Sequence, residues 1–175
     1  MGWRSRRGLL AFFGVILAAA TLGAGAPAPV VTKIRIRKEA HRMDLLTADL
    51  EVVATYRVAI GPGGSGYKHR EGDKVTPVGR YHVISRGPST FKIFMRLDYP
   101  NAEDRARFAK LKKDGSLPGE ATIGGDIGIH GGTPSGYATG DASHDWTLGC
   151  VSVEDSEIVA VAPLVKDGTV VDIED

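Results

Sequence analysis

The sequence predicts a mainly β protein with short helices, built as one domain. Several short segments alternate apolar and polar residues, which is the pattern of strands with one buried face. The 175 residues include 23 glycines and only 7% aromatic residues, a composition typical of a chain with many turns. With 42% hydrophobic and 25% charged residues, the chain is globular in character and long enough to bury a core of its own.

The N-terminal segment has a different composition from the rest. Three arginines precede an apolar stretch at 9–22, and small residues follow. This order is typical of a secretory signal peptide. Because Pro27 follows the small-residue cleavage pattern and disfavours cutting there, we assign 1–26 to a signal peptide or a retained N-terminal membrane anchor. A linker at 27–31 then leads to the domain at 32–175. We expect export to the periplasm or cell envelope.

Alternation predicts strands in the first half of the domain. The first strand places Ile34 and Ile36 on one face, opposite a row of basic residues that we expect to be solvated. The third has an apolar residue at every second position and ends at the glycine-rich loop 61–66. The predicted strands are 32–38, 43–46, 51–60, about 80–85 and 91–97.

The segment 99–115 predicts a helix, inserted between strands. Asn101 can cap its N terminus, and the acidic pair Glu103 and Asp104 lies near the positive end of the helix dipole. Lysines gather near the negative end, and Gly115 provides the stop.

The last third of the chain returns to short elements. The stretch "GDIGIHGG" at 125–132 predicts a short apolar strand that ends at His130, with two glycines after it. A polar loop then leads to a strand at 150–153. A short helix is predicted from Asp155, its cap, to Val161, and the final strand is 169–173.

Cys150 is the only cysteine of the chain and follows a glycine in "DWTLGCVS". In an oxidising compartment a lone thiol is open to oxidation and mispairing. It is therefore either buried and inert or retained because it reacts. A cysteine nucleophile needs a base, a group that orients the base, and donors for an oxyanion.

Among the histidines, His130 is the best candidate base. A strand end can hold its side chain rigidly, and the following glycines leave space above it. His144, in the polar loop before the cysteine, is less suited. We expect His82 to be structural and His41 and His69 to be solvated in turns.

Gly149 lets a substrate carbonyl approach, and the amides of Gly149 and Cys150 can point at a developing oxyanion. A zinc site is the competing reading, drawing on His130, His144, Cys150, Asp126, Asp141 and Asp145. No pair of these has zinc-finger spacing, so we expect no metal and no cofactor. A net charge of +1 also gives no reason to expect nucleic acid as a partner.

The chain resembles the L,D-transpeptidase catalytic domain, or YkuD-like, family. The resemblance rests on Ile129-His130-Gly131 followed, after a loop, by Thr147-Leu148-Gly149-Cys150. It covers about 32–174. Further stretches agree in order: Gly72-Asp73, Thr76-Pro77, Tyr99-Pro100-Asn101, Asp145-Trp146-Thr147 and Gly168-Thr169.

The resemblance implies a YkuD-like mixed β-sheet sandwich with a helical insertion, acting on peptidoglycan stem peptides. Cys150 would attack the carbonyl of the third stem residue, His130 would take the thiol proton, and the Gly131 carbonyl would orient the imidazole. A neighbouring imidazolium would lower the pKa of the thiol. Gly149, Thr147 and Tyr99 are the candidate oxyanion and substrate-binding residues. A thioester resolved by a second stem peptide would give a 3-3 cross-link.

Two alternatives stay open on the same scaffold. Water can resolve the thioester, giving an L,D-carboxypeptidase or amidase, or the protein can be a non-catalytic cell-wall-binding protein with an inert cysteine. The sequence also departs from the family near the cysteine. Leu148 stands where many members have histidine, Ser152 where many have arginine or asparagine, and Asp155 where asparagine is frequent. The missing arginine removes an obvious anchor for a substrate carboxylate. The oligomeric state is open, and the N-terminal segment is a candidate membrane tether.

Overall fold

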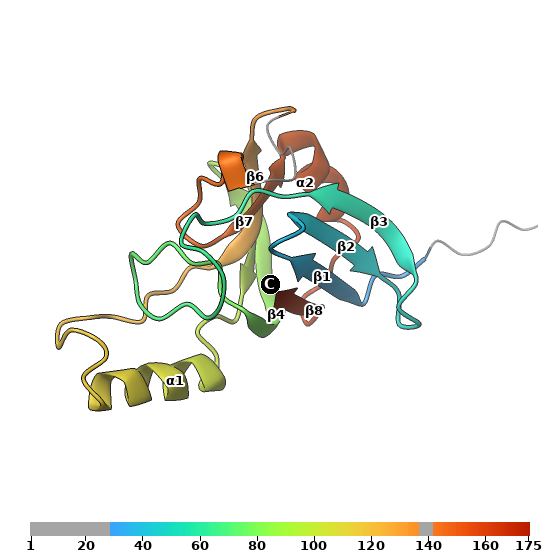
Figure 1. Cartoon of the computed structure of the whole chain (residues 1–175). Helices are drawn as coiled ribbons and strands as arrows, with labels where there is room; N and C mark the ends of the chain where they lie inside the picture. The colour runs from blue at the N-terminus through green and yellow to red at the C-terminus, as the bar shows by residue number, and fades with distance from the viewer. Residues whose placement is uncertain (1–28, 137–141) are drawn as a thin grey trace, which may run out of the picture.

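The computed structural model describes residues 29–136 and 142–175, so the predicted signal or anchor segment lies outside the described residues. Eight strands dominate the fold (Figure 1). They are β1 (Lys33–Arg37), β2 (Arg42–Leu46), β3 (Val52–Arg57), β4 (Gly79–Ser89), β5 (Lys92–Leu97), β6 (Gly128–Thr133), β7 (Val151–Glu154) and β8 (Val170–Glu174). The helices are α1 (Ala102–Lys113), α2 (Asp155–Val161) and the short 3-10 turn η1 (Ala142–His144).

The strands form one mixed sheet in the order β3-β2-β1-β8-β4-β5-β6-β7. Two pairs, β1 with β8 and β6 with β7, are parallel, and the other neighbours are antiparallel. The sheet is nearly closed because the chain beyond β3 returns to β7: Ala59 and Ser152 exchange two backbone hydrogen bonds of 2.8 and 2.9 Å. The predicted mainly β fold with short helices is confirmed.

The core lies inside this curved sheet. Ile34 and Ile36 of β1 are fully buried, as the alternation predicts, while the basic residues that alternate with them are half-buried. Helix α2 adds Ile158 and Val161 to the same core and packs against β5, β6 and β7. Among the described residues, no helix combines the length and the apolar character needed to cross a membrane.

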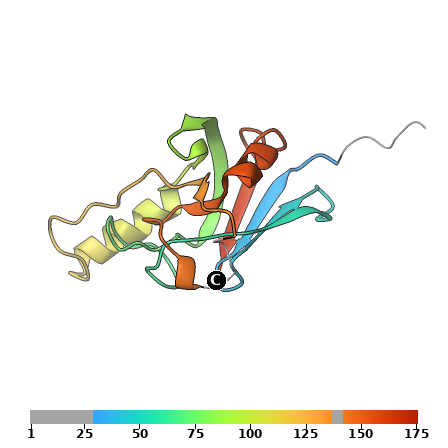
Figure 2. The same ribbon diagram turned by 90° about the horizontal axis from the view of Figure 1, so that it is seen from above.

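The predicted helical insertion is α1, which lies to one side of the sheet and away from α2 (Figure 2). Asn101 caps it as expected. The Asn101 side chain accepts the N–H groups of Glu103 at 2.9 Å and Asp104 at 3.1 Å, and the Asp104 carboxylate accepts the Asn101 N–H in return. Asp104 is also buried and accepts the Tyr81 hydroxyl, so this cap ties the helix to the sheet.

Two local predictions near the site are wrong. His130 lies inside β6 rather than at its end, because the strand continues through the glycines and the Gly131 N–H donates to the Phe91 carbonyl. A Cβ at Gly131 would lie 2.7 Å from the Asp155 carboxylate, so only glycine lets α2 approach so closely. Asp155 is not the helix cap. Glu154 occupies that position, and Asp155 instead accepts the Gly132 N–H at 2.8 Å.

Candidate active site

Parallel pairing of β6 with β7 brings the two candidate catalytic residues together. Ile129 is in register with Val151, and His130 with Ser152, so Cys150 comes directly before the strand that pairs with β6. Both side chains line one cleft of about 580 Å³. Cys150 is partly exposed, whereas His130 is 3% exposed. The thiol is therefore not sealed in the core, and it shares a cleft with the imidazole.

The imidazole of His130 is held in one orientation. Its Nδ1 lies 2.5 Å from the Gly131 carbonyl oxygen. A carbonyl can only accept, so Nδ1 carries the proton and the lone pair is on Nε2. Phe91 stacks on the ring at 4.5 Å between centroids, and Phe94 and Trp146 each lie at 5.8 Å. The aromatic rings and the carbonyl together fix both the tautomer and the direction of the ring.

The Gly131 carbonyl is itself held by a chain of buried hydroxyls. The Ser152 hydroxyl donates to it at 3.0 Å, and Thr133 lies 2.7 Å from Ser152. The Trp146 indole N–H donates to the Thr133 hydroxyl at 3.5 Å. Sequence reasoning missed this contact and treated Ser152 only as a departure from the family. The available signal was a serine between two apolar residues of a strand, which puts a hydroxyl on an inner face.

A tight turn presents Cys150. Gly149 has φ +133°, and a Cβ there would lie 2.9 Å from the Val75 carbonyl oxygen. Glycine is therefore required by backbone conformation and packing, in addition to any role in substrate approach. The Thr147 hydroxyl donates to the Cys150 carbonyl at 2.7 Å, and Thr76 donates to the same carbonyl at 3.4 Å.

The structure changes the roles expected for three residues. The Gly149 N–H donates to the Thr147 hydroxyl at 3.2 Å, so this amide does not point at an oxyanion position. Thr147 is 3% exposed and holds the backbone of the turn, although it also lines the cleft. Tyr99 is a core residue outside the cleft lining, and its hydroxyl donates to the Ile123 carbonyl at 3.2 Å. The Tyr-Pro-Asn motif marks the packing of α1, not the site.

Burial favours the neutral forms of both the cysteine and the histidine. Burial raises the pKa of the Cys150 thiol and outweighs the Gly128 backbone and the cations Lys68 and Arg96, which act in the opposite direction. Burial likewise lowers the pKa of His130, against the effect of the Gly131 carbonyl. The thiol donates to the Asp126 carbonyl at 3.4 Å. Both shifts run opposite to the lowered thiol pKa that the family resemblance implies.

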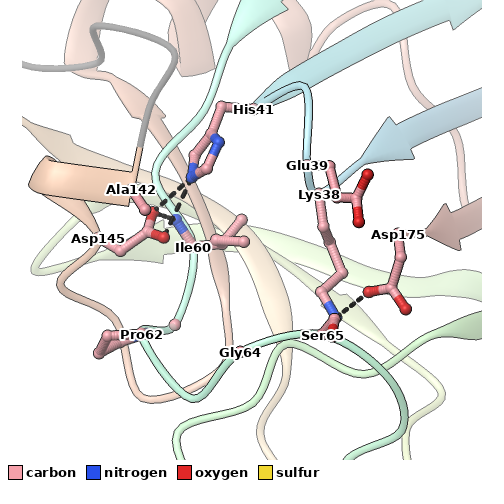
Figure 3. Close-up of a pocket in the computed structure, with 11 residues that line it drawn as sticks. Lys38, Glu39, His41, Ile60, Pro62, Gly64, Ser65, Ala142, Asp145 and Asp175 are labelled. Atoms are coloured by element: carbon pink, nitrogen blue, oxygen red, sulfur yellow. Dashed lines mark hydrogen bonds and ion pairs between the residues drawn. The ribbon is translucent and has the colours of Figure 1, made fainter.

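A second, smaller pocket of about 240 Å³ holds another buried histidine (Figure 3). The expectation that His41 is solvated is wrong, because it is 6% exposed and its Nε2 lies 3.1 Å from both carboxylate oxygens of Asp145. Asp145 also accepts the Ile60 N–H at 2.8 Å, and the Ile60 carbonyl accepts the N–H groups of Trp146 and Thr147. This pair therefore anchors the segment that leads to Cys150.

The remaining histidines lie apart from the cleft. His69 is exposed, as expected. His82 is on the surface of β4, where its Nδ1 lies 3.1 Å from the Asp98 carboxylate. His144 belongs to η1 and does not line the cleft. Within 29–136 and 142–175, no three histidine, cysteine or carboxylate side chains gather as metal ligands; Asp141 lies outside the described residues.

A buried, carbonyl-held histidine and a single cysteine in one cleft of a nearly closed β-sheet define a class of small β domain with a cysteine–histidine site. The family model YkuD, the L,D-transpeptidase catalytic domain, matches residues 32–173. The chain belongs to this family. None of the curated proteins matches it.

Solved structures of similar fold include the helical cell shape determining protein Pgp2 from Campylobacter jejuni, at 23% identity and a TM-score of 0.60. That alignment covers 83% of this chain and 48% of Pgp2, so this chain spans about half the length of Pgp2. An L,D-transpeptidase from Xylanimonas cellulosilytica aligns at 14% identity and a TM-score of 0.53, covering 85% of this chain and 62% of that one. The catalytic domain of the E. faecium L,D-transpeptidase aligns at 17% identity and a TM-score of 0.54. That alignment covers 81% of this chain and 95% of the other. At these levels of sequence identity, the similarities establish a shared fold.

Proposed function

We propose that the protein is a cysteine L,D-transpeptidase that acts on peptidoglycan stem peptides through a thioester and forms 3-3 cross-links. The observation that carries the proposal is that His130 shares a cleft with the lone cysteine and is held through Nδ1 by the Gly131 carbonyl. Family membership supplies the reaction class. The fold it shares with Pgp2 extends the proposal to a role in cell wall biogenesis and cell shape.

In the acylation step, Cys150 Sγ attacks the carbonyl carbon of the third stem residue. The thiol hydrogen turns from the Asp126 carbonyl to His130 Nε2, which takes the proton as the S–C bond forms. Because burial favours the neutral form of each group, we expect proton transfer to accompany the attack. His130 then returns the proton to the amide nitrogen as the C–N bond breaks. D-Alanine leaves, and a thioester remains on Cys150.

In the second step, an amine of another stem peptide attacks the thioester. His130 accepts a proton from that amine, the new C–N bond forms, and the C–S bond breaks. The proton passes back to sulfur, so the enzyme returns to its starting state. Water in place of the amine releases a tripeptide, which is the carboxypeptidase outcome. No energy source other than the donor peptide bond is needed outside the membrane.

The protein would do this work in the periplasm or cell envelope. The arginine-led apolar segment at the N terminus motivates this proposal, with 1–26 acting as signal peptide or membrane anchor. Fractionation of cells carrying the full chain, followed by N-terminal sequencing of the product, tests it. An intact N terminus in the membrane fraction supports the anchor, a shortened chain in the periplasm supports cleavage, and a cytoplasmic product contradicts both.

The proposed activity is tested by incubating purified disaccharide-tetrapeptide with the protein and analysing the products by mass spectrometry. Cross-linked dimers are the expected result, and tripeptides alone would indicate hydrolysis instead. Cys150→Ala should abolish both products while leaving the melting temperature close to wild type, because the side chain is partly exposed. A Cys150→Ala protein that still released D-alanine would show that the nucleophile is assigned wrongly.

A further inference from the structure

A buried lysine forms part of the wall of the cleft. Lys68 comes from the loop between β3 and β4 and is 6% exposed, yet it lines the same cleft as Cys150 and His130. Lysines are almost never buried to this degree unless paired. A Cβ placed on Gly149 would lie 3.5 Å from Lys68 Nζ. The ammonium group is therefore next to the residue that precedes the cysteine.

Asp73 holds this ammonium in place. Its carboxylate lies 2.6 Å from Lys68 Nζ and also accepts the backbone N–H groups of His69, Arg70 and Val75 at 2.8 to 3.0 Å. Burial opposes ionisation, but these hydrogen bonds lower the pKa of Asp73, so it stays charged. In the described part of the chain, Asp73 is the one acceptor that Nζ bonds. An ammonium has three N–H donors, so donor capacity is left for a ligand.

The other charged groups of the cleft already have partners. Glu71 accepts the Thr122 hydroxyl at 2.5 Å, and Asp126 forms an ion pair with Arg96. The rest of the lining is largely apolar or glycine, including Phe91, Phe94, Ile127 and Leu148. Lys68 is the one ammonium among the lining residues, and it already has Asp73 as a partner, with Glu71 also in the cleft. These acids disfavour a doubly charged phosphate more than a ligand with one negative charge. A carboxylate fits this description.

We propose that Lys68 binds the free C-terminal carboxylate of the donor peptide, which is the carboxylate of the leaving D-amino acid. This inference rests on the proposed function. Only the amide nitrogen and one Cα separate that carboxylate from the carbonyl that Cys150 attacks, and Lys68 lies beside the Gly149–Cys150 step. The lysine thus supplies the anchor that Ser152, in place of an arginine, does not. Lys68 would also select donor peptides by length, because one more C-terminal residue would move the free carboxylate out of reach of Lys68 Nζ.

Binding to an inactive protein tests the subsite without requiring turnover. In the Cys150→Ala background, calorimetry would compare a stem tetrapeptide that ends in a free carboxylate with the same peptide ending in a carboxamide. We expect the acid to bind about 10- to 100-fold more tightly, the range for a hydrogen bond between charged groups. Equal affinities, or no binding of either peptide, would overturn the inference whatever the lysine variants do.

Substitutions then locate the preference. Lys68→Met should bring the acid down to the affinity of the amide and leave the amide little changed, whereas Lys68→Arg should keep the preference. Lys74→Met is the matched control, since Lys74 is an exposed lysine of the same loop outside the cleft lining. If Lys68→Met lowered the affinity for both peptides equally with an unchanged melting temperature, the lysine would not be the group that binds the carboxylate. If the wild-type protein did not turn over the tetrapeptide although the preference for the free carboxylate was present, that result would contradict the proposed function and not the carboxylate subsite.

Discussion

The two pockets of the molecule each contain a buried histidine, but the histidines are bound differently. His130 is held by a neutral carbonyl through Nδ1, between aromatic rings. His41 is held by a carboxylate through Nε2, and that carboxylate also binds a backbone amide. Within the described residues each histidine leaves one ring nitrogen without a hydrogen bond, Nε2 of His130 and Nδ1 of His41. The difference lies in the surroundings: His130 shares its cleft with a thiol, whereas His41 is paired with the carboxylate that fixes the chain before Cys150. Burial alone does not make a histidine a base; it also needs a reacting group within its own cleft.

The largest effect should come from removing the candidate base. His130→Ala should lower kcat by about 100- to 10,000-fold, the usual contribution of general acid–base catalysis, with the fold intact. Steady-state kinetics on tetrapeptide donors measures it. His144→Ala is the matched control, because His144 precedes the cysteine but lies outside the cleft lining. Equal losses in the two variants would remove the distinction we draw for His130.

A smaller effect is expected from the hydroxyl that holds the Gly131 carbonyl. Ser152→Ala removes one of the two hydrogen bonds to that oxygen and leaves His130 less firmly oriented. We expect a loss of about tenfold in kcat, about 1.4 kcal/mol, with little change in KM. Ser156→Ala, an exposed serine of α2, serves as the control. A change in KM alone would mean that Ser152 affects substrate binding rather than the base.

The second histidine should matter for stability more than for chemistry. His41→Ala leaves the Asp145 carboxylate without its ring partner, which should cost about 1–3 kcal/mol in the free energy of unfolding, measured with urea. The rate should change only a few-fold, through loosening of the turn that carries Cys150. His82→Ala, at a surface pair, should cost no more than about 0.5 kcal/mol. A loss of rate as large as that of His130→Ala would overturn the comparison.

The smallest effect concerns the resting thiol. Alkylation by iodoacetamide needs the thiolate, so its rate should rise with pH through the pKa of Cys150. Because burial raises that pKa, the midpoint should lie above the ordinary value of 9.0. Turnover needs neutral His130, whose pKa is lowered, so activity should fall only below the ordinary 6.5 as the pH drops. A plateau of alkylation at neutral pH would instead reveal a preformed thiolate–imidazolium pair.

The parts of the fold predicted correctly are those set by local sequence. The Asn101 cap and the alternation of Ile34 and Ile36 depend on neighbours within a few residues, and the structure has both. The strand pattern near the cysteine is also local. The pairing of His130 with Cys150 is predicted from their chemistry, and in the structure both line one cleft beside the paired strands β6 and β7.

The parts that the sequence did not predict depend on contacts between distant segments. His41 and Asp145 are 104 positions apart, so their pairing requires the closure of the sheet at Ala59. Ser152 holds the Gly131 carbonyl only because two strands run in parallel. Tyr99 is the opposite case, since a motif residue that is predicted to bind substrate packs in the core against Tyr81. Sequence spacing alone does not distinguish a residue that supports the site, such as Ser152, from a motif residue that packs the core, such as Tyr99.

The most direct test of the central claim is to look for the acyl-enzyme. The protein would be mixed with tetrapeptide donor, quenched in acid and measured by intact-mass and peptide mass spectrometry. The account predicts an adduct of the tripeptide portion on the peptide containing Cys150, together with release of D-alanine, and much less adduct in His130→Ala. Donor consumption with no adduct on Cys150, or an adduct on another residue, would contradict it.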